Sequence, residues 1–146
     1  MKEPVTFIAS RDEGEPSILW VIGELDDFTV ATFEAELERL AAAGRPVVIE
    51  LSSCTFISSC ALHMLVRLRR QHPGRTLALV SASAHVAKLL RIAGLEPLLP
   101  RFENVVDALD RVSGPGARAA LSRRTVVTGR PAGAAHLREL RLVDGR

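Results

Sequence analysis

Three short apolar runs, separated by amphipathic segments, constrain the fold of this chain more than any other feature of its sequence. The runs are ILWVI at 18–22, VVIEL at 47–51 and LALV at 77–80. Continuous apolar runs of this length, containing β-branched residues, are typical of strands that are covered on both faces. A further strand is predicted at 5–10, and the polar, turn-forming residues after it indicate a hairpin.

Helical patterns occupy the segments between these runs. Apolar residues recur at helical spacing at about 30–40, 62–71, 84–93 and 104–112. Thr29 is a candidate N-cap and Gly44 a candidate terminating glycine of the first helix, while Asn104 and Asp107 resemble a capping pair for the fourth. Strands that alternate with helices predict an α/β fold: a mostly parallel sheet of four to five strands, an antiparallel N-terminal edge strand and about four helices packed on the sheet.

The charge distribution divides the chain into two parts. Residues 1–112 carry 12 basic and 15 acidic side chains, a net charge of −3, whereas residues 113–146 carry seven arginines against two acidic residues, a net charge of +5. A chain of 146 residues is long enough for one domain with a hydrophobic core. We therefore expect one domain at 1–112, followed by a flexible, basic tail rich in Gly, Pro and Arg at 113–146. The tail has no aromatic residue that would stack on bases, so no direct contact with nucleic acid is predicted.

The remaining composition points to the cytoplasm. No apolar run approaches the roughly 18 residues of a membrane span, and the first residues lack the pattern of a secretory signal. The two cysteines, Cys54 and Cys60, are then expected to be free thiols. The sequence does not predict an oligomeric state.

Signatures of catalysis are missing from the sequence. It contains no Gly-rich phosphate loop with a lysine, no GxSxG elbow and no His or Cys spacing typical of a metal site. Cys60 lies after a strand and at the start of a helix, where the helix dipole favours a thiolate. Cysteine-dependent phosphatases add an arginine six positions later, but that position is Val66, and the loop lacks glycines. We therefore predict no enzyme, no catalytic residue, no metal and no cofactor.

Three motifs in register resemble a known family. GELD at 23–26, FISSCAL at 56–62 and RIAGL at 91–95 are similar to the turn after the second strand, the strand–helix junction and a helix end of the STAS domain. This is the family of bacterial anti-sigma factor antagonists, and the resemblance covers about residues 5–112. It implies a STAS-like fold and a function in transcription regulation through protein–protein interaction.

The resemblance implies a partner-switching mechanism. Such a domain binds an anti-sigma factor, often a serine kinase, and so frees a sigma factor for transcription. The kinase phosphorylates the second hydroxyl of the junction, and the complex dissociates. A phosphate at a helix N-terminus meets free N–H groups, so the fold tolerates it, whereas a packed interface does not.

This chain departs from the family pattern at the junction itself. Ser58 stands where the family has Asp, Ser59 matches its first Ser, Cys60 occupies the phospho-acceptor position and Ala61 replaces Gly. Because a thiol is not an ordinary substrate of a serine kinase, we predict weak or absent phosphorylation, with Ser59 as the candidate phosphosite.

Helical geometry assigns roles to the hydroxyls of the junction. Ser58 points toward the core side and is the predicted N-cap, while Ser59 and Cys60 project toward the solvated stripe. Asp26 is either a solvated turn carboxylate or part of an acidic rim beside the acceptor. The residues expected to bind a partner are Asp26, Ser58, Ser59, Cys60, Ala61, Met64 and Arg67, although Met64 and Arg67 also fit ordinary helix positions.

Two other functions fit the same sequence. A STAS domain without a working acceptor fits a non-switching subunit of a multiprotein assembly or a transporter. A thiol at a helix start, Cys60, also fits redox sensing.

Overall fold

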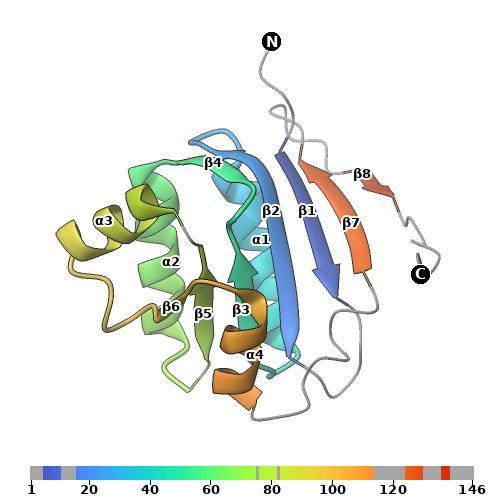
Figure 1. The fold of residues 1–146 in the computed structure, drawn as a ribbon. Coiled ribbons are helices and arrows are strands. Elements are labelled where there is room, and N and C mark those ends of the chain that lie inside the picture. The colour runs from blue at the N-terminus through green and yellow to red at the C-terminus, as the bar shows by residue number, and fades with distance from the viewer. Residues whose placement is uncertain are drawn as a thin grey trace.

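The computed structural model describes residues 5–10, 16–74, 76–81, 83–113, 124–129 and 136–138. Strands and helices alternate along most of this length, as the apolar runs predict (Figure 1). In chain order the elements are β1 (Val5–Ser10), β2 (Ser17–Leu25), α1 (Val30–Ala42), β3 (Val47–Glu50), β4 (Cys54–Ile57), α2 (Ser59–Gln71), β5 (Leu77–Val80), α3 (Ala84–Ile92), β6 (Arg101–Phe102), α4 (Val105–Ser113), β7 (Arg124–Gly129) and β8 (His136–Arg138).

The strands form one mixed sheet in the order β6-β5-β3-β2-β1-β7-β8, and β4 pairs with the end of β2. The pairs β2–β3, β3–β5, β5–β6 and β2–β4 are parallel. The N-terminal strand β1 pairs antiparallel with β2. This arrangement confirms the predicted α/β fold with a mostly parallel sheet and an antiparallel N-terminal pair.

Two strands beyond residue 113 were not predicted from the sequence. β7 pairs antiparallel with β1 over the whole of Val5–Ser10, and β8 pairs with β7. β1 therefore has a neighbour on both sides. The segment TVVT at 125–128 is short and lies among Gly, Pro and Arg, so its strand signal is weak in the sequence. Residues 114–123, 130–135 and 139–146 lie outside the described residues, and the domain boundary near 112 stays a prediction.

Helices cover both faces of the sheet. One core lies between the sheet and α1, α2 and α3, and within it the rings of Phe7 and Phe33 stack with their centroids 5.7 Å apart. A smaller core, which includes Ile18, Ala108 and Leu109, lies between the opposite face and α4. Figure 1 shows α4 in front of the sheet and α1 and α2 behind it.

Local capping explains where the helices begin and end. Ser83 caps α3, accepting a hydrogen bond from the N–H of Val86. Asn104 accepts a hydrogen bond from the N–H of Asp107 at 2.9 Å and donates one back to its carboxylate at 2.8 Å, which confirms the predicted capping pair of α4. Gly44 follows α1 with a φ of 77°, a left-handed conformation that favours glycine.

The fold places three helix N-termini at one edge of the sheet. β4 pairs parallel with β2, and β5 is parallel to β2 through β3. The carboxyl ends of these strands therefore lie at one edge, and α1, α2 and α3 begin after β2, β4 and β5. In open α/β sheets, ligands bind at the carboxyl ends of the strands. This edge contains the Ser58–Cys60 junction.

Candidate functional site

The pairing of β2 with β4 brings the loop at 26–29 beside the start of α2. Leu25 is opposite Ile57 in the parallel register, so both strands end together. The N–H of Ser58 donates to the carbonyl of Leu25 at 2.8 Å, which continues the pairing to the first residue after β4. Two segments about thirty residues apart in the chain therefore form one surface.

An irregularity in the pairing of β2 with β4 shapes this surface. The β2–β4 register shifts between Gly23 and Glu24, and Gly23 has a φ of 112°. A side chain at this φ would be strained, so the conformation favours glycine. The first residue of the GELD motif thus stands opposite the point where the β2–β4 register skips one residue of β4.

Ser58 is the N-cap of α2, as its position predicts. Its backbone is extended, with φ −77° and ψ 160°, and its Oγ accepts a hydrogen bond from the N–H of Ala61 at 3.2 Å. This bond satisfies one of the N–H groups that a helix start leaves without an intrahelical partner. The Ser58 hydroxyl therefore has a structural role that its exposed neighbours do not share.

Exposure separates the expected partner-binding residues into two groups. Ser59, Cys60 and Arg67 are exposed. Ala61 is fully buried and Met64 is only 2% exposed, so both side chains belong to the core. The expectation that Ala61 and Met64 contact a partner is therefore corrected: the helix turns both toward the sheet, with Leu65 and Leu68.

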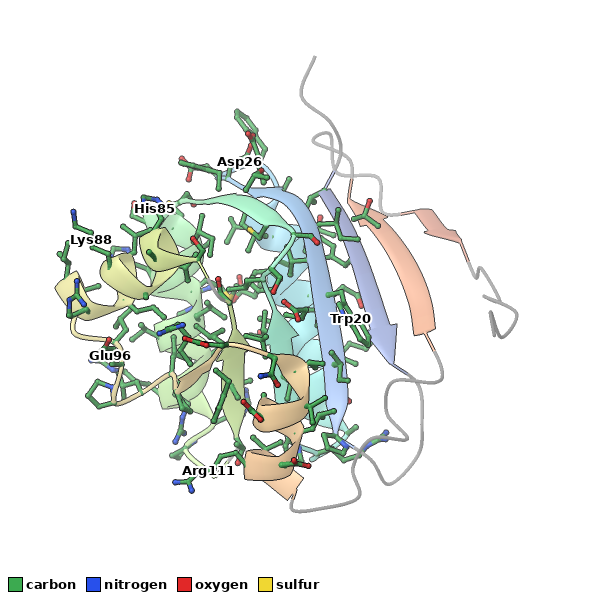
Figure 2. All side chains as sticks on the ribbon, viewed as in Figure 1. Trp20, Asp26, His85, Lys88, Glu96 and Arg111 are labelled. Carbon is green, nitrogen blue, oxygen red and sulfur yellow. The ribbon has the colours of Figure 1, made fainter. Side chains whose placement is uncertain are left out.

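The Asp26 side chain stabilises the turn at 26–29 by hydrogen bonds within it. Its Oδ1 accepts hydrogen bonds from the N–H groups of Phe28 and Thr29 at 2.9 and 3.0 Å, and its N–H donates to Thr29 Oγ1 at 2.9 Å. The Thr29 hydroxyl in turn donates to the carbonyl of Glu24 at 3.0 Å. Thr29 is the N-cap residue of α1, as predicted, but its side chain makes no cap bond with the helix; its hydroxyl bonds instead to Glu24 and Asp26. Figure 2 shows Asp26 at the same edge of the domain as His85, from α3.

Asp27, which sequence analysis did not single out, is the carboxylate beside Cys60. A hydrogen bond from the thiol to the Asp27 carboxylate raises the pKa of Cys60, and the negative charge of Asp27 raises it further. The thiol is therefore held in its protonated form. Two consecutive aspartates follow β2, and only the geometry of the turn decides which of them faces α2.

Phe28 is the second residue of this surface that the sequence did not reveal. Its side chain is 69% exposed, at the tip of the loop between β2 and α1. A single exposed apolar residue is common, but an exposed aromatic side chain beside a candidate interface is a typical anchor for a partner. A pattern of periodic apolar residues does not identify it, because it lies in a turn.

The second thiol has a different environment. Burial raises the pKa of Cys54, and hydrogen bonds to the backbone at Phe56 and Leu25 partly offset this effect. Its Sγ lies 3.2 Å from the carbonyl oxygen of Phe56. Cys54 and Cys60 are both free cysteines, as predicted. With both pKa values raised, neither thiol has the character of a reactive thiolate.

Arg67 connects α2 to α1. Its guanidinium donates a hydrogen bond to the carboxylate of Glu34, and the pair forms a salt bridge in which the Arg67 side chain is 54% exposed. Arg67 therefore has a structural partner and still presents part of its surface to solvent. The arrangement is compatible with either of the roles that the sequence left open.

The described part of the chain offers no site for metal chemistry. Among these residues there is no group of three or more His, Cys, Asp or Glu side chains placed to hold an ion. No helix in the same residues is long and apolar enough to cross a bilayer. At its carboxyl edge the fold presents an exposed helix start, a carboxylate and an exposed aromatic side chain.

Comparison with known proteins identifies the family. The STAS domain model matches residues 8–108, and the chain belongs to this family. A STAS-domain containing protein of Pseudomonas aeruginosa is 31% identical over 96 residues, which is 64% of this chain and 94% of that protein.

Solved structures share the fold. An anti-sigma factor antagonist from Mycobacterium paratuberculosis superposes with a TM-score of 0.68 at 23% identity, covering 77% of this chain and 98% of the other. The anti-sigma factor antagonist SpoIIAA in its unphosphorylated form gives a TM-score of 0.61 at 24% identity, covering 74% and 96%. The phosphorylated form of SpoIIAA, a Bacillus cell fate determinant, gives 0.55 at 22% identity, covering 73% and 98%.

Proposed function

We propose that this chain is a cytoplasmic anti-sigma factor antagonist, which binds an anti-sigma factor and thereby frees a sigma factor for transcription. It acts by binding and makes or breaks no substrate bonds. The observation that carries the proposal is the surface formed by the start of α2 and the 26–29 loop, where Ser59, Cys60 and Phe28 are all exposed. Structural neighbours named as anti-sigma factor antagonists support it.

The proposal places the partner on Ser59, Cys60, Asp27 and Phe28. The exposed Phe28 ring offers apolar area that a pocket on the partner can bury. The Cys60 thiol and the Ser59 hydroxyl beside it are uncharged, so they add little charge to the surface. Asp26 and Ser58 contribute by holding the loop and the helix start in place. Arg67, two turns along α2, lies at the border of this surface.

A binding measurement with the purified anti-sigma factor tests this proposal. Candidate anti-sigma factors encoded in the same genome are titrated with the full chain by isothermal calorimetry. We expect a 1:1 complex that Phe28→Ala weakens by roughly tenfold or more, as for a central aromatic residue. Ile92→Ala, on α3, is the matched control, because Ile92 is 72% exposed and lies outside the surface. Equal losses for the two variants, or no binding to any anti-sigma factor, would contradict the proposal.

The switch itself is altered in this chain. The acceptor position holds Cys60, and the Asp27 carboxylate beside it would repel a phosphate at Ser59 or at residue 60. These two features favour the second candidate function, a non-switching STAS subunit. Such a subunit binds its partner, and phosphorylation does not release it. The raised pKa of Cys60 does not favour redox sensing.

Phosphorylation of the chain is expected to be weak. Incubation with ATP and the cognate kinase, followed by intact-mass analysis, should leave the chain largely unmodified, because a thiol replaces the acceptor hydroxyl. Cys60→Ser restores the hydroxyl and is expected to accept phosphate. Stoichiometric phosphate on the unaltered chain, lost in Ser59→Ala, would instead identify Ser59 as a working phosphosite.

A further inference from the structure

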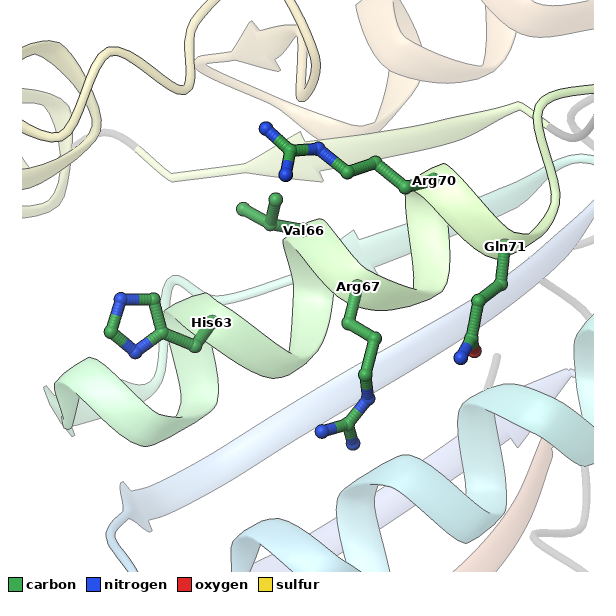
Figure 3. Close-up of a pocket in the computed structure, with 5 residues that line it drawn as sticks. All are labelled: His63, Val66, Arg67, Arg70 and Gln71. Atoms are coloured by element: carbon green, nitrogen blue, oxygen red, sulfur yellow. The ribbon is translucent and has the colours of Figure 1, made fainter.

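A groove runs along the outward face of α2, beyond the surface described above. It has a volume of about 380 Å³ and is lined by His63, Val66, Arg67, Arg70 and Gln71 (Figure 3). Two turns of helix separate its first and last residues, a length of about 12 Å. Val66 is half-buried, and the aliphatic stems of the arginines add to the apolar part of the lining.

The charge of α2 is opposite to that of the domain around it. The helix SCALHMLVRLRRQ carries three arginines and no carboxylate, while residues 1–112 have a net charge of −3 from 12 basic and 15 acidic groups. Arg67 is neutralised by Glu34 on α1, and Figure 3 shows its side chain directed toward that helix. Among the described residues Arg70 has no such carboxylate. Arg70 and His63 are exposed at the groove.

We infer that this groove binds an acidic segment of the protein partner, with carboxylates facing Arg70 and an apolar side chain resting on Val66. This inference deepens the proposed function and rests on it, because the groove continues the partner-binding surface along the same helix from Cys60 to Gln71. Because residues 1–112 carry a net charge of −3, the arginines on α2 form a local positive site that favours one position for an acidic segment.

The size and chemistry of the groove favour a protein segment over a nucleic acid. About two helical turns of a partner fit its length, as in other interfaces in which a helix lies in a groove. α2 has no Phe, Tyr or Trp side chain that would stack on a base.

A peptide titration of the full chain, followed by amide chemical shifts, tests the inference. The probe is a synthetic 14-residue helical peptide with Leu on one face and Glu on the other, and its matched control has Gln in place of every Glu. We expect the acidic peptide to shift the amides of residues 63–71 and to bind more weakly as salt is added. Arg70→Glu should weaken its binding about fivefold or more, since an exposed ion pair becomes a repulsion.

Arg91→Glu on α3 is the matched charge reversal, because Arg91 is also exposed but does not line the groove. Equal effects of Arg70→Glu and Arg91→Glu, or equal binding of the Glu and Gln peptides, would overturn the inference. So would a 20-base-pair DNA duplex that binds more tightly than the acidic peptide and shifts the same amides.

The same variants separate this inference from the proposed function. If an anti-sigma factor binds the chain and Arg70→Glu leaves its affinity unchanged, the groove inference fails and the proposed function stands. If no anti-sigma factor binds, the proposed function fails, and with it the assignment of the acidic segment to that partner.

Discussion

At the scale of the residue, three adjacent side chains at the start of α2 have three different environments. Ser58 accepts a hydrogen bond from its own helix, Ser59 is exposed, and Asp27 raises the pKa of the Cys60 thiol. The two serines therefore differ in what their hydroxyls do for the fold. Single-residue substitutions that remove one side-chain group can test each environment separately.

Removing the Ser58 hydroxyl is expected to destabilise the domain. Ser58→Ala leaves the N–H of Ala61 without its cap bond, at a cost of about 1 kcal/mol in the free energy of unfolding. Ser59→Ala, the matched control, should change that free energy by less than about 0.5 kcal/mol, because its side chain is exposed. Urea denaturation measures both values, and a larger loss for Ser59→Ala would contradict the assigned N-cap.

The acidity of Cys60 tests its contact with Asp27. The Asp27 carboxylate raises the pKa of the thiol, so Asp27→Asn is expected to lower that pKa and to speed alkylation near neutral pH. Iodoacetamide rates measured from pH 7 to pH 10, with the modified peptides separated by mass spectrometry, distinguish Cys60 from Cys54. An unchanged or higher pKa in Asp27→Asn would show that the carboxylate does not act on the thiol.

At the scale of the element, α2 combines a core face and a charged face. Ala61, Leu65 and Leu68 are buried against the sheet, whereas its arginines lie on the opposite and flanking sides. Periodicity alone predicted this division. It did not predict that Arg67 pairs with Glu34, because the contact depends on how α1 and α2 pack.

The Arg67–Glu34 pair is expected to contribute little to stability. A double-mutant cycle with Arg67→Gln and Glu34→Gln should give a coupling energy of no more than about 1 kcal/mol, since the pair is solvent-exposed and screened by salt. Thermal unfolding at low and high salt measures it. A coupling energy above about 2 kcal/mol that persists in 1 M salt would mean that the pair is effectively desolvated.

At the scale of the whole molecule, β7 is the element that most changes the architecture expected from the sequence. It pairs with β1 along the full length of Val5–Ser10 and so covers a strand that was expected at the edge of the sheet. An unpaired strand edge is a site of self-association. We therefore expect β7 to contribute to the stability of the domain.

Deleting β7 tests this role. A chain that ends at Ser113 lacks β7, and we expect it to melt at a lower temperature and to self-associate more than the full chain, because the outer edge of β1 is exposed. A chain that ends at Gly129 keeps β7 and is the matched control. Equal melting temperatures for all three chains would support a domain that ends near residue 112.

The sequence by itself determined the α/β class, the four helices and the cap positions Ser58 and Asn104. These features depend on periodicity and on local hydrogen bonding, which are encoded within a few neighbouring residues. The three motifs also pointed to the STAS family, to which the match over residues 8–108 assigns the chain.

Only the tertiary structure decided what surrounds that junction. The parallel pairing of β2 with β4 put Asp27 against Cys60, the rotation of α2 buried Met64, and the packing of α1 gave Arg67 its partner. Some of these contacts join residues that are distant in the chain. Others depend on which of two chemically similar neighbours, such as Asp26 and Asp27, faces the contact. Such choices depend on the geometry of packed elements, which no short stretch of sequence contains.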